Sequence, residues 1–452
     1  MDEPTPSLVE LEKQTAFGKR ELEEILNGFS RSFRHGLDKD ENTMIPSFVC
    51  RLPTGTETGT YLALDLGGTN LRVAAVTLLG DGKTEIEHKQ YPIPEELKNG
   101  DAESLFNWIA DGTKSLLDLP GVKAKIADKE LYMGVTFSFP IKQTNIDKGK
   151  VMKMGKSFNV SGLVDHDVIE LLRDAFDRQE IKVNIPAIVN DTVGTLVAHA
   201  YKDQNTIVSI IVGTGTNAAC IVESREIKKH VFKPNFPQTM IVNTEISLMG
   251  SDFLKRTKYD KILDSQSSSP GFQPFEKMVS GLYLGELVRL TIVDYVKNLN
   301  LFGGVLPGGM EVPYSFTSIQ MSNIESDKSS NPENLVKVLT EDFKLPKDSL
   351  SNEDMLKVRE LVKRYSHRSA QLSAVVAASL IKFQCGDIKE IEREVRIAVD
   401  GSVYHHFNKY SFWMAKTLRE IQDVKEDKKV KLVGIKNGGC IGAAIIAMLY
   451  SH

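Results

Sequence analysis

The chain lacks long hydrophobic runs, closely spaced cysteines and an excess of charge of either sign. None of its apolar stretches approaches the roughly 18 residues that a membrane-spanning helix needs, so we expect no membrane segment. Its four cysteines, Cys50, Cys220, Cys385 and Cys440, stand far apart without the paired spacing of zinc sites, which predicts reduced thiols. The 56 basic residues nearly balance the 60 acidic ones, and the net charge of −4 argues against a nucleic-acid or anionic membrane partner.

The beginning of the chain also lacks the features of a secretory signal. Residues 1–6 are acidic and contain prolines, whereas a signal peptide carries basic residues followed by an apolar run. We therefore predict a cytoplasmic protein. Its 452 residues allow two or three domains with large cores, and its composition is typical of a soluble globular protein that acts on small molecules.

Strand-like and helix-like segments alternate along the chain, which is typical of an α/β protein. The expected strands are 61–64, 71–76, 131–139, 181–189, 206–212, 218–222, 394–399 and 431–435. Apolar residues at helical spacing predict helices within 8–33, 102–117, 192–201, 275–296, 355–383 and 441–449.

A glycine turn follows a predicted strand at residues 67–68, 213–215, 401 and 438–439. In the first turn, backbone N–H groups and hydroxyls can meet an anion, while the carboxylate of Asp65 can hold a magnesium-bound water. That segment alone also fits an ordinary hairpin. The repetition of the turn in one α/β chain predicts a duplicated architecture that converges on one ligand.

These turns supply the phosphate-binding parts that phosphoryl transfer requires. Gly438 and Gly439 begin a predicted helix, whose free N–H groups favour an anion. No cluster of metal-ligating side chains is evident, so magnesium is inferred from the nucleotide. The nucleotide-side candidates are Asp65, Gly67, Gly68, Thr69, Asn70, Arg72, Gly213, Thr214, Gly215, Thr216, Gly401, Ser402, Gly438 and Gly439.

Asp191 is the best candidate for a catalytic base. The run Ile188-Val189-Asn190-Asp191-Thr192 ends a buried strand and begins a helix, which places Asp191 where strand ends meet. An aspartate before a helix is also a common N-cap, and the motif alone leaves both interpretations open. A positioned general base contributes about 10²–10⁴-fold to a rate.

From about Met44 to its end, the chain resembles eukaryotic hexokinases of the fungal hexokinase and glucokinase type. The resemblance rests on segments 64–73, 135–140, 190–195, 213–217, 275–286 and 400–404, which occur in the order found in that family. It implies two lobes of the actin-like ATPase fold, each a mixed β-sheet flanked by helices, with a cleft between them. The implied small lobe is 60–190 joined by the helix 437–452, and the large lobe is 191–436 joined by the helical segment 1–59.

The resemblance also implies an activity, in which the enzyme uses ATP with Mg²⁺ to phosphorylate the 6-hydroxyl of a hexose. Asp191 would accept the proton of that hydroxyl, with Lys156 beside it as a catalytic cation. Thr214, Gly401 and Ser402 would lie on the nucleotide side. The remaining hydroxyls of the sugar would contact Ser138, Lys156, Asn190, Asn217, Glu245 and Glu276.

The chain departs from the family pattern in the implied sugar site. The family's Thr-Lys-Gly-Phe appears as Gly155-Lys156-Ser157-Phe158, and its Asn-x-Glu-Trp-Gly as Asn243-Thr244-Glu245-Ile246-Ser247. Both Gly155 and Ile246 reduce the bulk expected beside the sugar. We therefore interpret the substrate as N-acetylglucosamine, with glucose as the alternative, although the Trp-to-Ile exchange also fits simple repacking. The family's Asp-Gly-Ser-Gly becomes Asn437-Gly438-Gly439-Cys440, which alters the nucleotide side.

A different class of function fits the same resemblance, because some hexokinase-like proteins act as sugar sensors or regulatory partners. Such a protein has no need of the base Asp191, so its presence favours an enzyme. The expected partners are the sugar and ATP, with no nucleic acid and no membrane. Either a monomer or a homodimer is compatible with the sequence.

Overall fold

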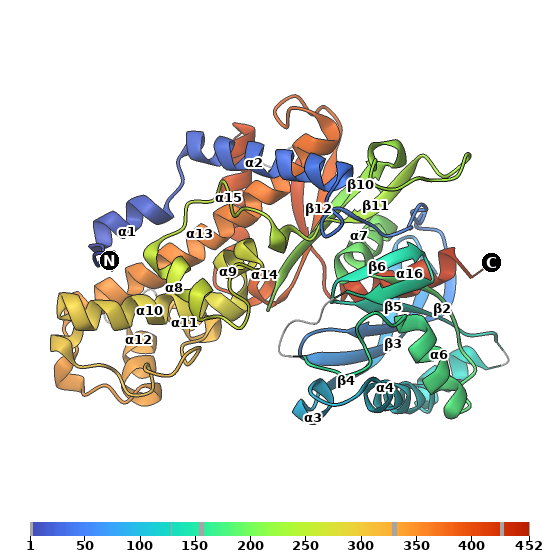
Figure 1. Cartoon of the computed structure of the whole chain (residues 1–452), viewed down its shortest axis with the longest axis horizontal. Coiled ribbons are helices and arrows are strands. Elements are labelled where there is room, and N and C mark those ends of the chain that lie inside the picture. Colours follow the sequence, from blue (N-terminus) through green and yellow to red (C-terminus); the bar gives the residue numbers. More distant parts are fainter. Residues whose placement is uncertain (1–2, 128, 153–157, 328–331, 425–428, 452) are drawn as a thin grey trace.

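The computed structural model describes residues 3–451 except 128, 153–157, 328–331 and 425–428. Two β-sheets, each flanked by helices, form two lobes (Figure 1). The first sheet has the order β4-β3-β2-β5-β8, in which β2 to β4 are antiparallel neighbours while β5 and β8 run parallel to β2. Its strands are β2 (Thr58–Leu66), β3 (Asn70–Gly80), β4 (Lys83–Pro92), β5 (Tyr132–Phe137) and β8 (Asn184–Val189).

Four helices and a small hairpin accompany the first sheet. The apolar faces of α4 and α6 enclose a hydrophobic core against it, together with residues such as Leu64, Val73 and Val135. These elements are α3 (Glu95–Lys98), α4 (Ala102–Leu117), α5 (Pro120–Ile126), α6 (Val168–Arg178), β6 (Ile141–Asn145) and β7 (Lys148–Val151).

The second sheet repeats the plan of the first. Its order is β1-β11-β10-β9-β12-β13, with β9, β10 and β11 antiparallel and with β12 and β13 parallel to β9. Its strands are β1 (Ile45–Pro46), β9 (Thr206–Val212), β10 (Thr216–Glu223), β11 (Thr239–Asn243), β12 (Val395–Asp400) and β13 (Val430–Gly434). The glycine turns at 67–68 and 213–215 therefore occupy equivalent β-hairpins in the two sheets.

Two helices pack against each other between the sheets, α7 (Asp191–Lys202) and α16 (Gly438–Leu449) (Figure 1). α7 lies against β9 and β10, whereas α16 lies against β2 and β5. Glycines permit their close crossing, because a Cβ on Gly442 would lie 1.8 Å from the carbonyl oxygen of Gly194. Both helices begin beside the glycine turns.

Most of the other helices cover the second sheet, and the longest is the central α13. In α2, apolar residues such as Leu22, Phe29 and Phe33 recur at helical spacing and are buried in the core of this lobe. The helices are α1 (Leu8–Thr15), α2 (Lys19–Asp38), α8 (Lys258–Gln266), α9 (Pro274–Val279), α10 (Gly281–Leu299), α11 (Ser318–Ser326), α12 (Glu333–Lys337), α13 (Asn352–Cys385), α14 (Ser402–His406) and α15 (Tyr410–Gln422).

The structure confirms the predicted α/β alternation and the duplicated architecture. The helix expected within 275–296 is divided at Ser280 into α9 and α10, and β4, β11 and α15 were not predicted from the sequence. We propose the lobe boundaries 60–190 and 191–436 given above, because each sheet has a hydrophobic cluster of its own. Within the described part of the chain, no helix combines the length and apolar character that crossing a bilayer requires.

Candidate active site

A cavity of about 500 Å³, here called the catalytic cavity, lies where the glycine turns meet. Its lining comes from both lobes, with Ser138 following β5 and Asp191 beginning α7. It brings together most of the residues predicted from the sequence. They are Gly67, Gly68, Thr69, Ser138, Asn190, Asp191, Gly213, Thr214, Gly215, Thr216, Asn217, Glu245, Glu276, Gly401 and Ser402.

Asn190 caps helix α7, so Asp191 is not its N-cap. The side-chain oxygen of Asn190 accepts a hydrogen bond of 2.9 Å from the backbone N–H of Thr192. Asp191 is the first helical residue, and its Oδ2 accepts a hydrogen bond of 2.8 Å from the hydroxyl of Ser138. The carboxylate of Asp191 is thus held in the cavity without a capping role.

A chain of side-chain hydrogen bonds leads away from Asn190 along the floor of the catalytic cavity. The amide nitrogen of Asn217 donates to Oδ1 of Asn190 at 3.2 Å and to Oδ1 of Asn243 at 2.8 Å. Asn243 in turn donates to Oε1 of Glu245 at 2.8 Å. Because each amide is fixed by the next, the chain orients a row of polar atoms suited to a polyol.

Glu276 is held at the same floor by the second glycine turn. Its Oε2 accepts a hydrogen bond of 2.9 Å from the backbone N–H of Thr216. A Cβ on Gly215 would lie only 2.6 Å from that oxygen, so the glycine is required for the approach. Glu245 and Glu276 are both buried, with 6% and 5% of their surface exposed.

The third and fourth glycine turns are connected to the second. A Cβ on Gly213 would lie 3.5 Å from Cα of Gly401, so the second and third turns are in contact. Asp400 connects them to the fourth turn, because its two oxygens accept hydrogen bonds from the backbone N–H groups of Gly401 at 2.7 Å and Gly438 at 2.9 Å. The N–H groups of Gly401 and Gly438 are thus paired with Asp400, and the second and third turns line the cavity through Gly213, Thr214, Gly215 and Gly401.

Asp65 lies next to the fourth glycine turn, because a Cβ on Gly439 would be 3.7 Å from its carboxylate oxygens. The negative charge of Asp65 is electrostatically unfavourable there. Burial and the neighbouring carboxylates of Asp191 and Asp400 raise the pKa of Asp65 from 3.8 to about 6, against the opposing effects of Thr136 and Arg72. The hydroxyl of Thr136 donates to Oδ1 of Asp65 at 2.9 Å. A divalent cation brought by a nucleotide would relieve this repulsion, so the residues present fit bound magnesium. Among the described residues, no group of three or more His, Cys, Asp or Glu side chains forms a metal site by itself.

Several predicted residues lie elsewhere. Gly155 and Lys156 fall outside the described residues. Ile246 has no exposed surface and packs in the core of the larger lobe, so the structure does not place it on the wall beside the sugar. Arg72 donates to Oδ1 of Asn437 at 3.1 Å and to Gln90 at 2.8 Å, which links the first hairpin to α16 rather than to the cavity. Asn70 donates to Thr69, and neither Asn70 nor Gly438 is among the described residues that line the cavity.

The sequence reasoning missed other residues of the cavity wall. Gln273 donates to the hydroxyl of Ser247 at 3.4 Å, and both residues line the cavity beside Glu245. Gln273 precedes helix α9 in a left-handed conformation with φ of 54°, so helical spacing from Glu276 could not have found it. The others are Glu95, Lys98, Phe139, Pro140, Ile211, Phe272, Leu282 and Tyr283.

Comparisons with known proteins identify the family. Two family models described as hexokinase match residues 7–201 and 207–449. The chain is 36% identical to a hexokinase of Schistosoma mansoni over 453 residues, covering 97% of this chain and 96% of that protein, and 33% identical to a glucokinase of Aspergillus niger, covering 97% and 96%. The crystallised Schistosoma mansoni hexokinase, complexed with glucose, matches the fold with a TM-score of 0.85 at 35% identity over 97% of each chain. The chain therefore belongs to the hexokinase family of sugar kinases.

Proposed function

We propose that this protein transfers the γ-phosphoryl group of ATP to the 6-hydroxyl of glucose. The observation that carries the proposal is the placement of Asp191. It is not used as a helix cap, it accepts a hydrogen bond from Ser138, and it lines the same cavity as Asn217, Glu245, Glu276 and the glycine turns. In the proposed reaction the oxygen of the 6-hydroxyl bonds to the γ-phosphorus, the bond to ADP breaks, and the proton passes to Asp191. The glucose bound by the Schistosoma mansoni hexokinase supports this choice of sugar.

The cofactors are ATP and Mg²⁺, as is general in the family. Thr69, Thr214, Gly401 and Ser402 would meet the phosphates, and Asp65 would hold the magnesium ion through bound water. Magnesium would neutralise charge on the transferred phosphoryl group. This role explains why a carboxylate is kept at a place where burial and two other carboxylates oppose its charge.

The experiment is a coupled assay of ADP release with glucose and MgATP, comparing the wild type with Asp191→Asn. The amide has the same size and can still accept from Ser138, so the variant isolates the loss of the base. We expect kcat/KM to fall by about 10²–10⁴-fold. Asp177→Asn, which changes an exposed carboxylate on α6, is the matched control. Equal and negligible rates for wild type and Asp191→Asn would refute the proposal and favour a sugar sensor.

N-acetylglucosamine is the second candidate substrate. Gly155 supports it as the smaller residue at a position where the family has threonine, and Ile246, being buried in the core, does not contribute. The comparison of kcat/KM for the two sugars decides between them. A value for glucose about tenfold above that for N-acetylglucosamine, roughly 1.4 kcal/mol, would exclude the amino sugar as the preferred substrate.

A further inference from the structure

A histidine beside the glycine turns connects three segments of the larger lobe and of α16. His405 lies on α14, directly after the third glycine turn, and is not among the described residues that line the catalytic cavity. Its Nε2 lies 3.1 Å from Oδ1 of Asp400, at the end of β12, and 2.8 Å from the carbonyl oxygen of Ile435, which follows β13. The imidazole therefore joins α14, the end of β12 and the segment that leads from β13 to α16.

The neighbours of Nε2 determine which ring nitrogen of His405 carries a hydrogen. A carbonyl oxygen and a carboxylate oxygen accept hydrogen bonds and do not donate them, so Nε2 is assigned as the donor. The side chains of His405 and Asp400 are only 14% and 18% exposed. Removal of the donor would leave two acceptor oxygens close together and largely withdrawn from water, which is unfavourable. His405 thus holds together two segments whose facing oxygens would otherwise repel each other.

The surrounding backbone and side chains keep the ring of His405 in place. A Cβ on Gly434, the last residue of β13, would lie 3.3 Å from Cε1 of the ring, so the glycine leaves the space that the imidazole fills. The ring of Tyr404 packs edge-on at 5.3 Å between centroids. The backbone N–H of His405 donates to the carbonyl oxygen of Gly401 at 3.1 Å, which ties α14 to the third turn.

Asp400 passes this constraint to the third and fourth glycine turns. Its Oδ1, which lies beside His405, also accepts from the N–H of Gly401 at 2.7 Å, and its Oδ2 accepts from the N–H of Gly438 at 2.9 Å. Gly401 adopts φ of 109°, and a Cβ there would lie 2.3 Å from the carbonyl oxygen of Val212. The turn is therefore tightly packed, and a rotation of the Asp400 carboxylate would disturb both N–H contacts at once.

Gly401 and Ser402 line the catalytic cavity, and the proposed function places the phosphates of ATP against them. We propose that His405 is a positioning residue for the nucleotide, which acts through Asp400 on Gly401 and Ser402, and this inference rests on the proposed function. The sugar side is held by other contacts. Asn243 joins Asn217 to Glu245, and the N–H of Thr216 binds Glu276. Loss of the His405 donor therefore weakens nucleotide binding and leaves sugar binding largely intact.

The experiment compares three substitutions of His405. His405→Leu removes the donor, and the shorter amide of His405→Asn cannot reach both oxygens. In His405→Gln the side-chain nitrogen can donate from the position of Nε2. His406→Leu, at the exposed next residue, is the matched control. We expect KM for MgATP to rise about tenfold in the first two variants, as for a lost hydrogen bond to a charged group, with kcat and KM for glucose changed less than about twofold.

Calorimetric titration with MgADP in the presence of glucose makes the same comparison without turnover. Affinity should fall about tenfold in His405→Leu and His405→Asn, stay within about threefold of wild type in His405→Gln, and stay constant in His406→Leu. The rescue by glutamine separates a role of the donor from a merely structural role of the ring. Wild-type affinity in His405→Asn, or an equal loss in His405→Gln, would overturn the inference.

Phosphorylation of glucose by the wild type distinguishes this failure from that of the proposed function. A wild type that does not phosphorylate glucose refutes the proposed function. An active wild type with an unchanged KM for MgATP in the His405 variants refutes only the role of His405.

Discussion

Replacing Asp65 by asparagine should stabilise the ligand-free protein while abolishing its kinase activity. Asparagine is nearly isosteric, and its side-chain oxygen can still accept the hydrogen bond that Thr136 donates to Asp65 at 2.9 Å. The substitution removes only the negative charge that burial, Asp191 and Asp400 oppose. Most substitutions in a cavity destabilise a protein or leave it unchanged, so a gain in stability would be diagnostic.

The magnitude follows from the raised pKa of Asp65. A carboxyl group whose pKa is higher in the folded state than its ordinary value binds its proton more tightly there, so the wild type loses stability as the pH rises from about 4 to above 6. With values of 3.8 and about 6, the loss is about 1–2 kcal/mol at pH 5 and about 3 kcal/mol at pH 7.5. Asp65→Asn avoids this loss, and its advantage should therefore disappear below pH 4.

The assay is denaturant or thermal unfolding of both proteins across this pH range without nucleotide. Saturating MgATP should raise the melting temperature of the wild type more than that of Asp65→Asn, because Asp65 holds the magnesium ion in the proposed function. Asp400→Asn is the control in the same cluster. Its carboxylate accepts hydrogen bonds from the N–H groups of Gly401 and Gly438, so the amide should destabilise by about 1.5–3 kcal/mol. An Asp65→Asn protein no more stable than wild type at pH 7.5 would refute the electrostatic reasoning.

Two further substitutions test an ion pair inside the larger lobe and the crossing of α7 and α16. Arg368 is fully buried and forms two hydrogen bonds of 2.7 Å with Asp260. Arg368→Met should therefore lower the free energy of urea unfolding by about 3–5 kcal/mol. Adding Asp260→Asn should recover part of this loss, because it removes the buried charge that has no partner. Gly442→Ala should destabilise by at least 1–3 kcal/mol and lower the melting temperature, because the new Cβ would lie 1.8 Å from the carbonyl oxygen of Gly194. Gly18→Ala, whose added Cβ meets nothing closer than 3.8 Å, should change little by comparison.

The fold was largely predictable because its signals are local. An apolar strand followed by a glycine turn commonly forms a β-hairpin. Its repetition at Gly67 and Gly213 indicated the duplication that the two strand orders display. The position of Asp191 was predictable for the same reason. Whether Asp191 caps α7 was not predictable, because that depends on whether Asp191 or Asn190 accepts a hydrogen bond from the N–H of Thr192, and both are good capping residues.

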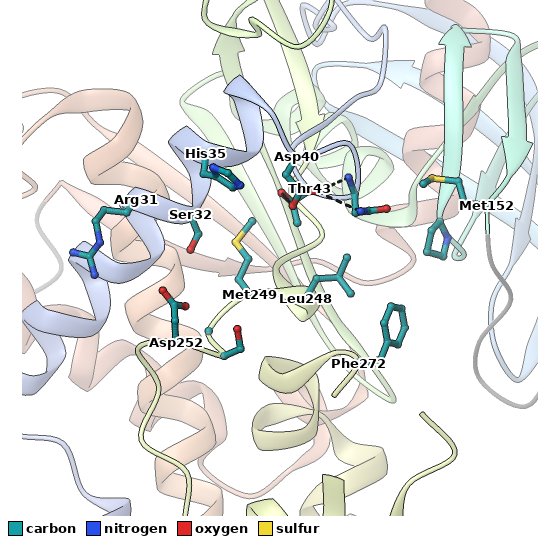
Figure 2. A pocket seen from close by; sticks show the side chains of 14 residues that line it. Arg31, Ser32, His35, Asp40, Thr43, Met152, Leu248, Met249, Asp252 and Phe272 are labelled. Atoms are coloured by element: carbon teal, nitrogen blue, oxygen red, sulfur yellow. Dashed lines mark hydrogen bonds between the residues drawn. The ribbon is translucent and has the colours of Figure 1, made fainter. Parts of the chain in front are cut away.

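The wall of the catalytic cavity around Glu245 could not be predicted from local patterns. Glu245 adopts a left-handed conformation with φ of 49°, after which the side chain of Ile246 enters the core and that of Ser247 faces the cavity. Sequence spacing does not reveal such a reversal. A second cavity, of about 560 Å³, could be predicted from the sequence even less (Figure 2). Its walls come from segments around residues 31–43, 140, 152, 248–252 and 272, which share no motif and meet only in the folded chain.

The crossing of α7 and α16 fixes the position of the site residues at the start of one helix relative to those at the start of the other. α7 begins with Asp191 and packs on the second sheet, whereas α16 begins with Gly438 and packs on the first. Each helix thus begins at the site and rests on the sheet of its own lobe, and the contacts between Gly194 and Gly442 leave no space for sliding. The hydrogen bond from Gly438 to Asp400 fixes the N-terminus of α16 to the third glycine turn. We therefore expect any rotation of one lobe against the other to occur about this helix pair.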